Sequence, residues 1–219
     1  MSLADVKSRI AAACERSGRD AAGVTLVAVS KGRSVDDIEE LYAAGHRDFG
    51  ENRADELAEK ASQLPDDIRW HFVGHLQSNK ARVVRPVVTH LHSLDRPSLA
   101  KAWLKGAGEP PPAYLQVNIG REPQKSGAYP AETEQMAVAF DAMGLPLAGL
   151  MAIIPIVARP EEARPYFQEL AALGRRVGES VPAVAGLSMG MTDDFEVAVE
   201  EGATVIRVGR AIFGDHTSS

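Results

Sequence analysis

Residues 24–45 read VTLVAVSKGRSVDDIEELYAAG, a short apolar run followed by a pattern with helical spacing. The run at residues 24–30 is rich in β-branched side chains, which predicts a strand buried on both faces. Ser34 and Asp37 form a capping-box-like helix start, with Asp in place of the preferred Glu. Gly45 can end the helix. The apolar residues between these ends share one helical face: Val35, Ile38, Leu41 and Tyr42.

The same order of strand and helix recurs along the chain and gives about eight strand candidates. The later strands are predicted at HRDFG, WHFVG, VVTHLHS, AYLQVNI, LAGLMAI, AVAGLS and TVIRVG. The helices that follow them are predicted at 51–64, 78–84, 97–104, 131–143, 161–177 and 193–201, with an extra helix at 1–18. Strands that alternate with helices pair in parallel through right-handed crossovers. Eight units predict an α/β fold of the closed (β/α)₈, TIM-barrel type, whereas five or six would indicate an open doubly wound sheet.

Composition limits the class of protein. The 219 residues fit one barrel domain spanning 1–219, because single α/β barrels run to roughly 200–250 residues. A net charge of −6 provides no basic surplus for a nucleic acid. No apolar stretch approaches the roughly 20 residues that span a bilayer, and the N-terminus has no apolar signal core. The lone Cys14 fits a reducing compartment and a buried position. We therefore expect a cytoplasmic protein without nucleic-acid or membrane partners.

The carboxyl ends of the strands are where a barrel of this kind places its chemistry, so we expect polar residues at one end of an otherwise apolar barrel. Lys31 follows the first strand, where partial desolvation would favour the neutral amine and Schiff-base chemistry. It could equally be a lysine that extends into water. Ser188, Gly209 and Arg210 end the neighbouring seventh and eighth strands, where barrels often hold a phosphate, although such glycines also make tight turns. A lysine amine beside a phosphate cradle favours a phosphorylated aldehyde, such as pyridoxal 5′-phosphate (PLP).

Several longer motifs add a family resemblance to this interpretation. The chain contains AVSKGRS at 28–34, FGENRADEL at 49–57, WHFVGHLQSNK at 70–80 and LSMGMTDDFEVAV at 187–199, and VIRVGRAIFG follows at 205–214. From about Leu3 to Gly214 it resembles the PLP-binding proteins of the YggS/PROSC type, the pyridoxal phosphate homeostasis proteins. The resemblance implies a fold-type III PLP barrel like the N-terminal domain of alanine racemase, without the β-domain. It also implies PLP bound as an internal aldimine, and a role as carrier or regulator of PLP.

The resemblance also implies roles for individual residues. The cofactor-binding set would be Lys31, Asn52, Met151, Ser188, Arg207, Gly209 and Arg210. Lys31 would be the aldimine lysine, and Ser188, Gly209 and Arg210 would hold the phosphate, mostly through backbone N–H groups. Arg207 would approach the pyridine nitrogen, and Asn52 and Met151 would line the ring. Arg210 stands where a small hydroxyl residue is common in the family, which leaves a side-chain hydroxyl contact to the phosphate open.

Binding is favoured over catalysis for two reasons. An arginine beside the pyridine nitrogen is permanently charged and cannot accept a proton, so the ring is a weaker electron sink. The chain also has no room for a second domain, so we expect one face of the cofactor to be open. We therefore expect a monomer that is not an enzyme, with PLP as its ligand and PLP-dependent apoenzymes as candidate partners. The alternatives are a PLP-dependent amino-acid racemase or decarboxylase, and a phosphosugar barrel in which Lys31 forms an aldolase Schiff base.

The remaining candidates receive plainer interpretations. His90 and His92 share one strand face without an evident third ligand, so no metal site is predicted, and His75 could lie near the barrel mouth. The charges at 51–59 and 193–201 are expected on solvated helix faces. The loop 121–127, which contains Lys125, could be a lid or a partner contact.

Overall fold

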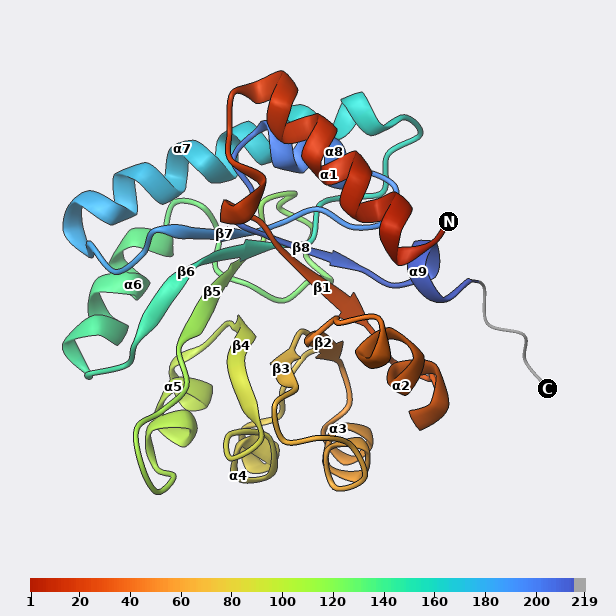
Figure 1. The fold of residues 1–219 in the computed structure, drawn as a ribbon. Helices are drawn as coiled ribbons and strands as arrows, with labels where there is room; N and C mark the ends of the chain where they lie inside the picture. The colour runs from red at the N-terminus through yellow and green to blue at the C-terminus, as the bar shows by residue number, and fades with distance from the viewer. Residues whose placement is uncertain (215–219) are drawn as a thin grey trace.

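A closed barrel of eight parallel strands forms the centre of the computed structural model, which describes residues 1–214 (Figure 1). Each strand pairs with the next along the chain, and the eighth pairs with the first. The strands are β1 Thr25–Val29, β2 Asp48–Glu51, β3 Arg69–Phe72, β4 Val88–Leu94, β5 Ala113–Val117, β6 Leu147–Ala152, β7 Gly186–Ser188 and β8 Val205–Val208. The predicted (β/α)₈ fold is confirmed.

Helices surround this barrel, one or more after each strand (Figure 1). They are α1 Leu3–Ser17, α2 Val35–Ala43, α3 Ala54–Ala61, α4 Ala81–Val84, α5 Pro97–Leu104, α6 Thr133–Ala142, α7 Arg164–Ser180, α8 Phe195–Glu200 and α9 Arg210–Phe213, with single 3₁₀ turns at Ala21–Gly23, Ser78–Lys80 and Pro160–Ala163. α5 has the predicted bounds, whereas α3 is shorter than predicted because β2 runs on to Glu51. Within residues 1–214, none of these helices combines the length and the apolar character that crossing a bilayer requires.

The start and end of α2 follow from its sequence. The Ser34 hydroxyl accepts a hydrogen bond from the Asp37 N–H at 3.1 Å, and the Asp37 carboxylate accepts one from the Ser34 N–H at 2.9 Å. Gly45 has a φ of +84°, a left-handed conformation that glycine adopts without steric cost. The predicted capping box and glycine stop are therefore confirmed, and β1 and α2 form the first strand–helix unit of the barrel.

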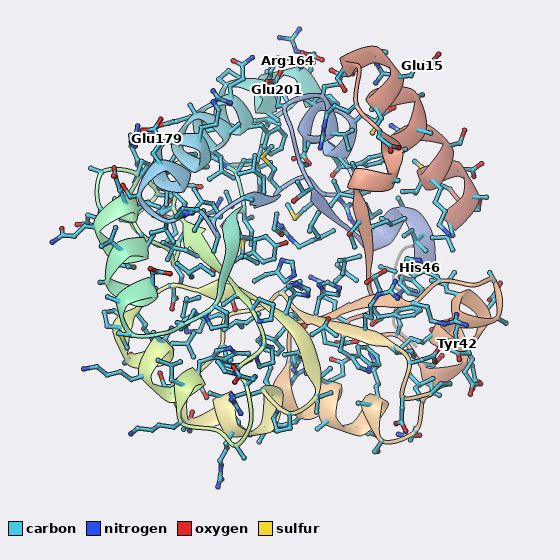
Figure 2. All side chains as sticks on the ribbon, turned by 60° about the vertical axis from the view of Figure 1, so that its left-hand side comes forward. Glu15, Tyr42, His46, Arg164, Glu179 and Glu201 are labelled. Atoms are coloured by element: carbon cyan, nitrogen blue, oxygen red, sulfur yellow. The ribbon has the colours of Figure 1, made fainter. Side chains whose placement is uncertain are left out.

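The N-terminal helix α1 packs against the outside of the barrel beside α8 (Figure 1). Its inner face is apolar and includes the buried Val6, Ile10 and Cys14, as the sequence predicts. Charged pairs bridge the neighbouring outer helices, including Arg16 with Glu200 at 2.7 Å. Figure 2 shows a second such pair, Arg164 and Glu201, side by side on the outer surface. α1 thus extends the outer layer of helices.

Two packed layers hold the barrel together, and the inner one is not as apolar as expected. The larger apolar cluster lies between the strands and the helices, and a small cluster inside the barrel contains Val27, Tyr114, Met151 and Val205. The rest of the interior includes buried polar side chains, among them His71, His92, Ser188 and Arg207. The expectation of an otherwise apolar barrel is therefore wrong. These groups are tolerated inside because they hydrogen-bond to one another.

Candidate functional site

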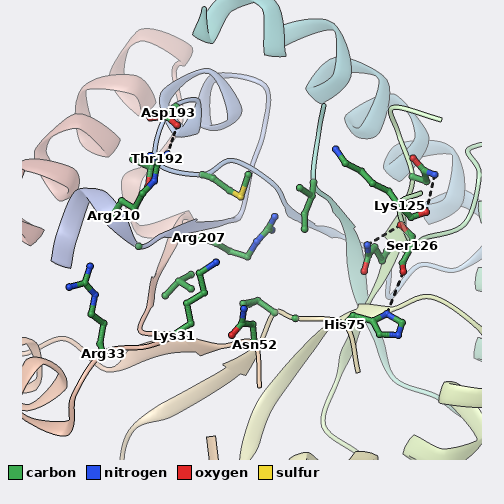
Figure 3. A pocket seen from close by; sticks show the side chains of 18 residues that line it. Lys31, Arg33, Asn52, His75, Lys125, Ser126, Thr192, Asp193, Arg207 and Arg210 are labelled. Carbon is green, nitrogen blue, oxygen red and sulfur yellow. Dashed lines mark hydrogen bonds and ion pairs between the residues drawn. The ribbon is translucent and has the colours of Figure 1, made fainter. Parts of the chain in front are cut away.

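A pocket of about 610 Å³ opens at the carboxyl ends of the strands, where loops from most of the barrel units meet (Figure 3). Among its described lining residues, five carry basic side chains and one carries an acidic side chain. The basic residues are Lys31, Arg33, Lys125, Arg207 and Arg210, and the acidic residue is Asp193. The chain as a whole has a net charge of −6, so positive charge is concentrated here. Such a cleft attracts and holds an anion.

Lys31 directly follows β1 and extends into this pocket toward Arg207 (Figure 3). The residue is exposed, so the expected partial desolvation is wrong: the side chain leaves the apolar strand and faces the open mouth. The backbone on both sides of Lys31 is held by α3. The Gly32 N–H donates to Glu56 Oε1 at 2.5 Å, and the Ser30 carbonyl accepts from Lys60 Nζ at 2.7 Å. The amine therefore has no partner within residues 1–214, while the backbone that carries it is fixed.

Four residues form this support, which we call the α3 brace: Ser30, Glu51, Glu56 and Lys60. Lys60 is buried and lies 2.7 Å from a carboxylate oxygen of both Glu51 and Glu56. Glu51 is fully buried and accepts a further hydrogen bond from the Ser30 hydroxyl at 2.7 Å. Burial raises the pKa of Glu51, and the contacts with Lys60 and Ser30 oppose that rise. The expectation of a solvated charged face at 51–59 is therefore wrong for Glu51.

Arg207 forms part of the pocket floor and is almost wholly buried. Its Nη1 donates to the Ser188 hydroxyl at 2.5 Å, and its Nη2 donates to the Ala152 carbonyl at 2.9 Å. Burial lowers the pKa of Arg207 to about 10, so the guanidinium stays protonated at neutral pH. It is thus a fixed hydrogen-bond donor at the base of the pocket.

Two of the seven predicted cofactor-binding residues do not reach the pocket with their side chains. Met151 and Ser188 lie opposite each other on β6 and β7, and both are fully buried in the barrel interior. Their strand positions point the side chains inward below the pocket floor, and the Ser188 hydroxyl is engaged by Arg207. The five that do line the pocket are Lys31, Asn52, Arg207, Gly209 and Arg210.

The wall at the ends of β7 and β8 has the features of a phosphate cradle. Gly209 precedes α9, whose first N–H groups have no acceptor within the helix. A side chain at Gly209 would bring its Cβ within 3.1 Å of the Val29 carbonyl. Arg210 pairs with Asp193 at 2.7 Å, and both are exposed. Thr192 lines the same wall (Figure 3) and was missed from the sequence, although its hydroxyl can replace the one absent at Arg210.

Asn52 and the opposite wall complete the pocket. The buried Asn52 Oδ1 has no hydrogen-bond partner among residues 1–214, and a buried acceptor of this kind fits a donor on a ligand. His75 lies at the mouth, as the sequence suggested, where Nδ1 is 3.4 Å from the Ser126 hydroxyl (Figure 3). Lys125 donates to the Ile154 carbonyl at 3.1 Å, which places the loop 121–127 at the pocket edge.

No group of three or more His, Cys, Asp or Glu residues in the described part of the chain is arranged to hold a metal ion. His71, His90 and His92 do meet inside the barrel, on β3 and β4. However, His71 Nδ1 and His92 Nε2 are 2.9 Å apart and hydrogen-bond to each other. Both ring nitrogens of His71 and of His92 are thus occupied, whereas His90 Nδ1 has no hydrogen-bond partner among residues 1–214.

Comparison with known proteins agrees with the barrel and its site. A family model described as alanine racemase, N-terminal domain, matches residues 1–217, so the chain has the barrel of that class. A relative from Aquifex aeolicus is 39% identical, with 97% of this chain and 96% of the relative covered. One from Pseudomonas aeruginosa is 40% identical, covering 97% and 93%. Both relatives are named pyridoxal phosphate homeostasis protein, and this chain belongs to that family, which confirms the resemblance.

Solved structures with the same barrel include a member of this family and an enzyme. PipY of Synechococcus elongatus with PLP bound is 35% identical and superposes with a TM-score of 0.78, covering 95% of this chain and 100% of PipY. Alanine racemase from Corynebacterium glutamicum superposes with a TM-score of 0.70 at 15% identity, covering 100% of this chain and 62% of the racemase. The second likeness shows a shared fold alone.

Proposed function

We propose that this protein binds PLP covalently through Lys31 and serves in PLP homeostasis as a carrier or regulator. The observation that carries the proposal is the free Lys31 amine in a pocket with five basic side chains and a braced backbone on either side. PLP supplies an aldehyde carbon that a lysine amine attacks with loss of water. PLP-bound PipY and the names of the family's members support the same assignment.

The pocket residues fit the parts of this ligand. The backbone at Gly209 and Arg210, with the Thr192 hydroxyl and the Arg210 charge, would hold the phosphate. Arg207 would donate to the ring nitrogen, and the unpartnered Asn52 Oδ1 would accept from a donor on the ring or its substituents. Ser188 contributes from below by accepting from Arg207, and Met151 fills the space under the floor.

The arrangement supports binding rather than turnover. Arg207 is buried, protonated and held by two acceptors, so it cannot supply or remove a proton at the ring nitrogen at neutral pH. The family's members carry the name of a homeostasis protein, not that of an enzyme. For the racemase or decarboxylase alternative, the likeness to such enzymes is one of fold alone. Incubation of the PLP-loaded protein with L- and D-amino acids tests the point, and sustained turnover above that of free PLP would contradict the carrier role.

The aldolase alternative has less support. Among residues 1–214, no carboxylate lies within hydrogen-bond or ion-pair distance of the Lys31 amine, and the nearby Glu51 and Glu56 pair with Lys60 instead. An aldolase lysine requires an acid–base partner beside it. A phosphosugar trapped on Lys31 by borohydride, with no PLP bound, would favour this alternative.

The decisive experiment compares the wild type with Lys31→Ala and with Lys125→Ala, the other lysine of the pocket. Each protein is incubated with PLP, freed of unbound PLP, examined by visible absorption, reduced with borohydride and mapped by mass spectrometry. We expect the bound-PLP band and an adduct on Lys31 in the wild type and in Lys125→Ala. We expect neither in Lys31→Ala. An adduct on another lysine, or none, would overturn the proposal.

We further propose that residues 1–219 act as one monomeric domain that delivers PLP to apoenzymes. The open mouth of the pocket supports this, since Lys31 is exposed where another protein can approach. Size-exclusion chromatography with light scattering measures the oligomeric state. Activation of a PLP-dependent apoenzyme by the loaded protein, faster than by dissociated PLP, measures the transfer.

A further inference from the structure

Five side chains form a continuous line of hydrogen bonds through the barrel, which we call the barrel relay. Each comes from a different strand: Arg207 from β8, Ser188 from β7, His92 from β4, His71 from β3 and Asp48 from β2. The successive distances are 2.5 Å from Arg207 Nη1 to Ser188 Oγ, 2.8 Å from Ser188 Oγ to His92 Nδ1, 2.9 Å from His92 Nε2 to His71 Nδ1 and 3.2 Å from His71 Nε2 to Asp48 Oδ1. The relay links the pocket floor to the opposite, amino end of the barrel.

The two ends of the relay fix the direction of every bond while both rings are neutral, because a guanidinium only donates and the Asp48 carboxylate, which contacts His71 Nε2, only accepts. A guanidinium only donates, so Ser188 Oγ accepts from Arg207, and its own proton is free to point at His92 Nδ1. His92 Nδ1 then accepts, which places the ring proton on Nε2, where it is donated to His71. His71 in turn carries its proton on Nε2 and donates it to the Asp48 carboxylate. All four bonds therefore run from Arg207 toward Asp48.

The surroundings favour this set of protonation states. His92 is fully buried, and burial is the main reason that its pKa lies well below the usual value. Burial alone would raise the pKa of Asp48, but hydrogen bonds from His71 and Arg69 bring it below its usual range, so the relay ends on an ionised acceptor. The titratable or charged groups facing the relay are Asp48 of β2, Arg69 and His71 of β3, His90 and His92 of β4, Tyr114 of β5, Asp194 before α8 and Arg207 of β8.

We propose that His92 and His71 are positioning residues for Arg207, locked as neutral Nε2–H tautomers between the Ser188 hydroxyl and the Asp48 carboxylate. The lock keeps Ser188 as an acceptor and so fixes the guanidinium at the pocket floor.

The proposal has two parts. The first, the tautomers of His92 and His71, concerns the protein alone, and the second, an effect on bound PLP, rests on the proposed function. Nitrogen-15 NMR of the histidine rings at neutral pH, on protein freed of PLP, tests the first part. We expect both rings as neutral Nε2–H tautomers. In Ser188→Ala, His92 has lost the donor to its Nδ1, so its tautomer becomes mixed. Ser188→Thr keeps the hydroxyl and should preserve the single tautomer.

His90→Gln is the matched control, because His90 stacks on His71 at 5.1 Å between ring centroids but lies outside the relay. We expect this change to leave the tautomers of His71 and His92 as they are. A charged or Nδ1–H His92 in the wild type would overturn the proposal. So would an unchanged His92 tautomer in a Ser188→Ala protein whose circular dichroism shows the native fold.

A second measurement tests the effect on Arg207. In the PLP-loaded protein, His92→Phe keeps the ring that stacks on Tyr114 at 4.6 Å but removes both relay bonds. We expect the pH titration of the bound-PLP absorption to shift by about one unit, a tenfold change in the equilibrium, while Lys31 remains the modified residue. An unchanged titration would overturn the positioning role. If even the wild type binds no PLP, the proposed function fails, and the NMR test of the relay still stands.

Discussion

The mouth of the barrel and its interior both carry charge, but they hold it in opposite ways. At the mouth, Lys31 and Arg210 are exposed, and Arg210 pairs with the exposed Asp193. Below the surface, Lys60 of α3 and Arg207 of β8 are buried, and each has at least two acceptors. Exposed pairs contribute roughly 0–1 kcal/mol to stability, whereas removing one partner of a buried pair costs about 3–5 kcal/mol.

The comparison shows that the protein meets two requirements in different places: charge that can pair with a ligand, and charge that fixes the shape of the site. The charged side chains at the mouth can pair with a ligand because they are exposed and are not fully paired within the protein. The buried charges cannot meet a ligand, except where Arg207 reaches the pocket floor, and they serve instead to fix backbone and side-chain positions. Substitutions inside should therefore change stability or geometry, and substitutions at the mouth should change binding with little change in stability.

The largest expected effect is on the α3 brace. Lys60→Met leaves the fully buried Glu51 carboxylate without its cation, and we expect the free energy of unfolding to fall by about 3–5 kcal/mol. Lys80→Met is the matched control, since Lys80 pairs with Asp55 at 2.8 Å on the surface and should cost no more than about 1 kcal/mol. Urea unfolding followed by circular dichroism measures both. Equal losses in the two variants would contradict the contrast between interior and mouth.

A smaller effect is expected on the pH dependence of stability. Burial is the main cause that lowers the pKa of His90 to about 4 from an ordinary value of 6.5. The unfolded chain therefore binds a proton in this range that the folded protein does not. The contribution of His90 is fully present above pH 6.5, is lost as the pH falls toward 4, and changes no further below that.

Urea midpoints measured between pH 7 and pH 4 check this expectation. In His90→Gln the loss of stability across that window should be smaller than in the wild type. Asp48, whose pKa lies below its usual range, acts in a separate window: its contribution is present above about pH 4 and is lost at lower pH. An identical pH profile in the wild type and His90→Gln would show that His90 is not held neutral by the barrel.

Most of the fold could be predicted from the sequence because its signals are local. The strand at residues 24–30, the capping box of Ser34 and Asp37 and the helix at Pro97–Leu104 each depend on neighbours within a few positions. The strand count then determined the closed barrel. The polar interior could not be predicted in the same way, because Ser188 and His92 are 96 residues apart and meet only through the strand order.

The residues of the candidate site that could be predicted are those at the carboxyl ends of strands. Lys31, Arg207 and Gly209 could be placed because each lies at or just beyond the carboxyl end of a strand. The side chains of Met151 and Ser188 lie below the pocket, and the sequence could not show this, because an apolar or small residue near a strand end can point either into the pocket or into the barrel below it. Only the register of β6 against β7 decides which, and that register is a property of the closed sheet.

The smallest expected effect is at Arg210, an exposed residue at the mouth of the pocket. Arg210→Thr removes one exposed charge and an exposed pair with Asp193, so the free energy of unfolding should change by less than about 1 kcal/mol. PLP affinity should fall by less than about tenfold, since the backbone at Gly209 and the Thr192 hydroxyl remain. The dependence of PLP affinity on salt should also become less steep, because Arg210→Thr removes one positive charge from the mouth.

Asp193→Asn is the matched control: it frees Arg210 and should tighten PLP binding slightly. Loss of all binding in Arg210→Thr would mean that one mouth charge dominates, and the division between a replaceable mouth and a fixed interior would fail.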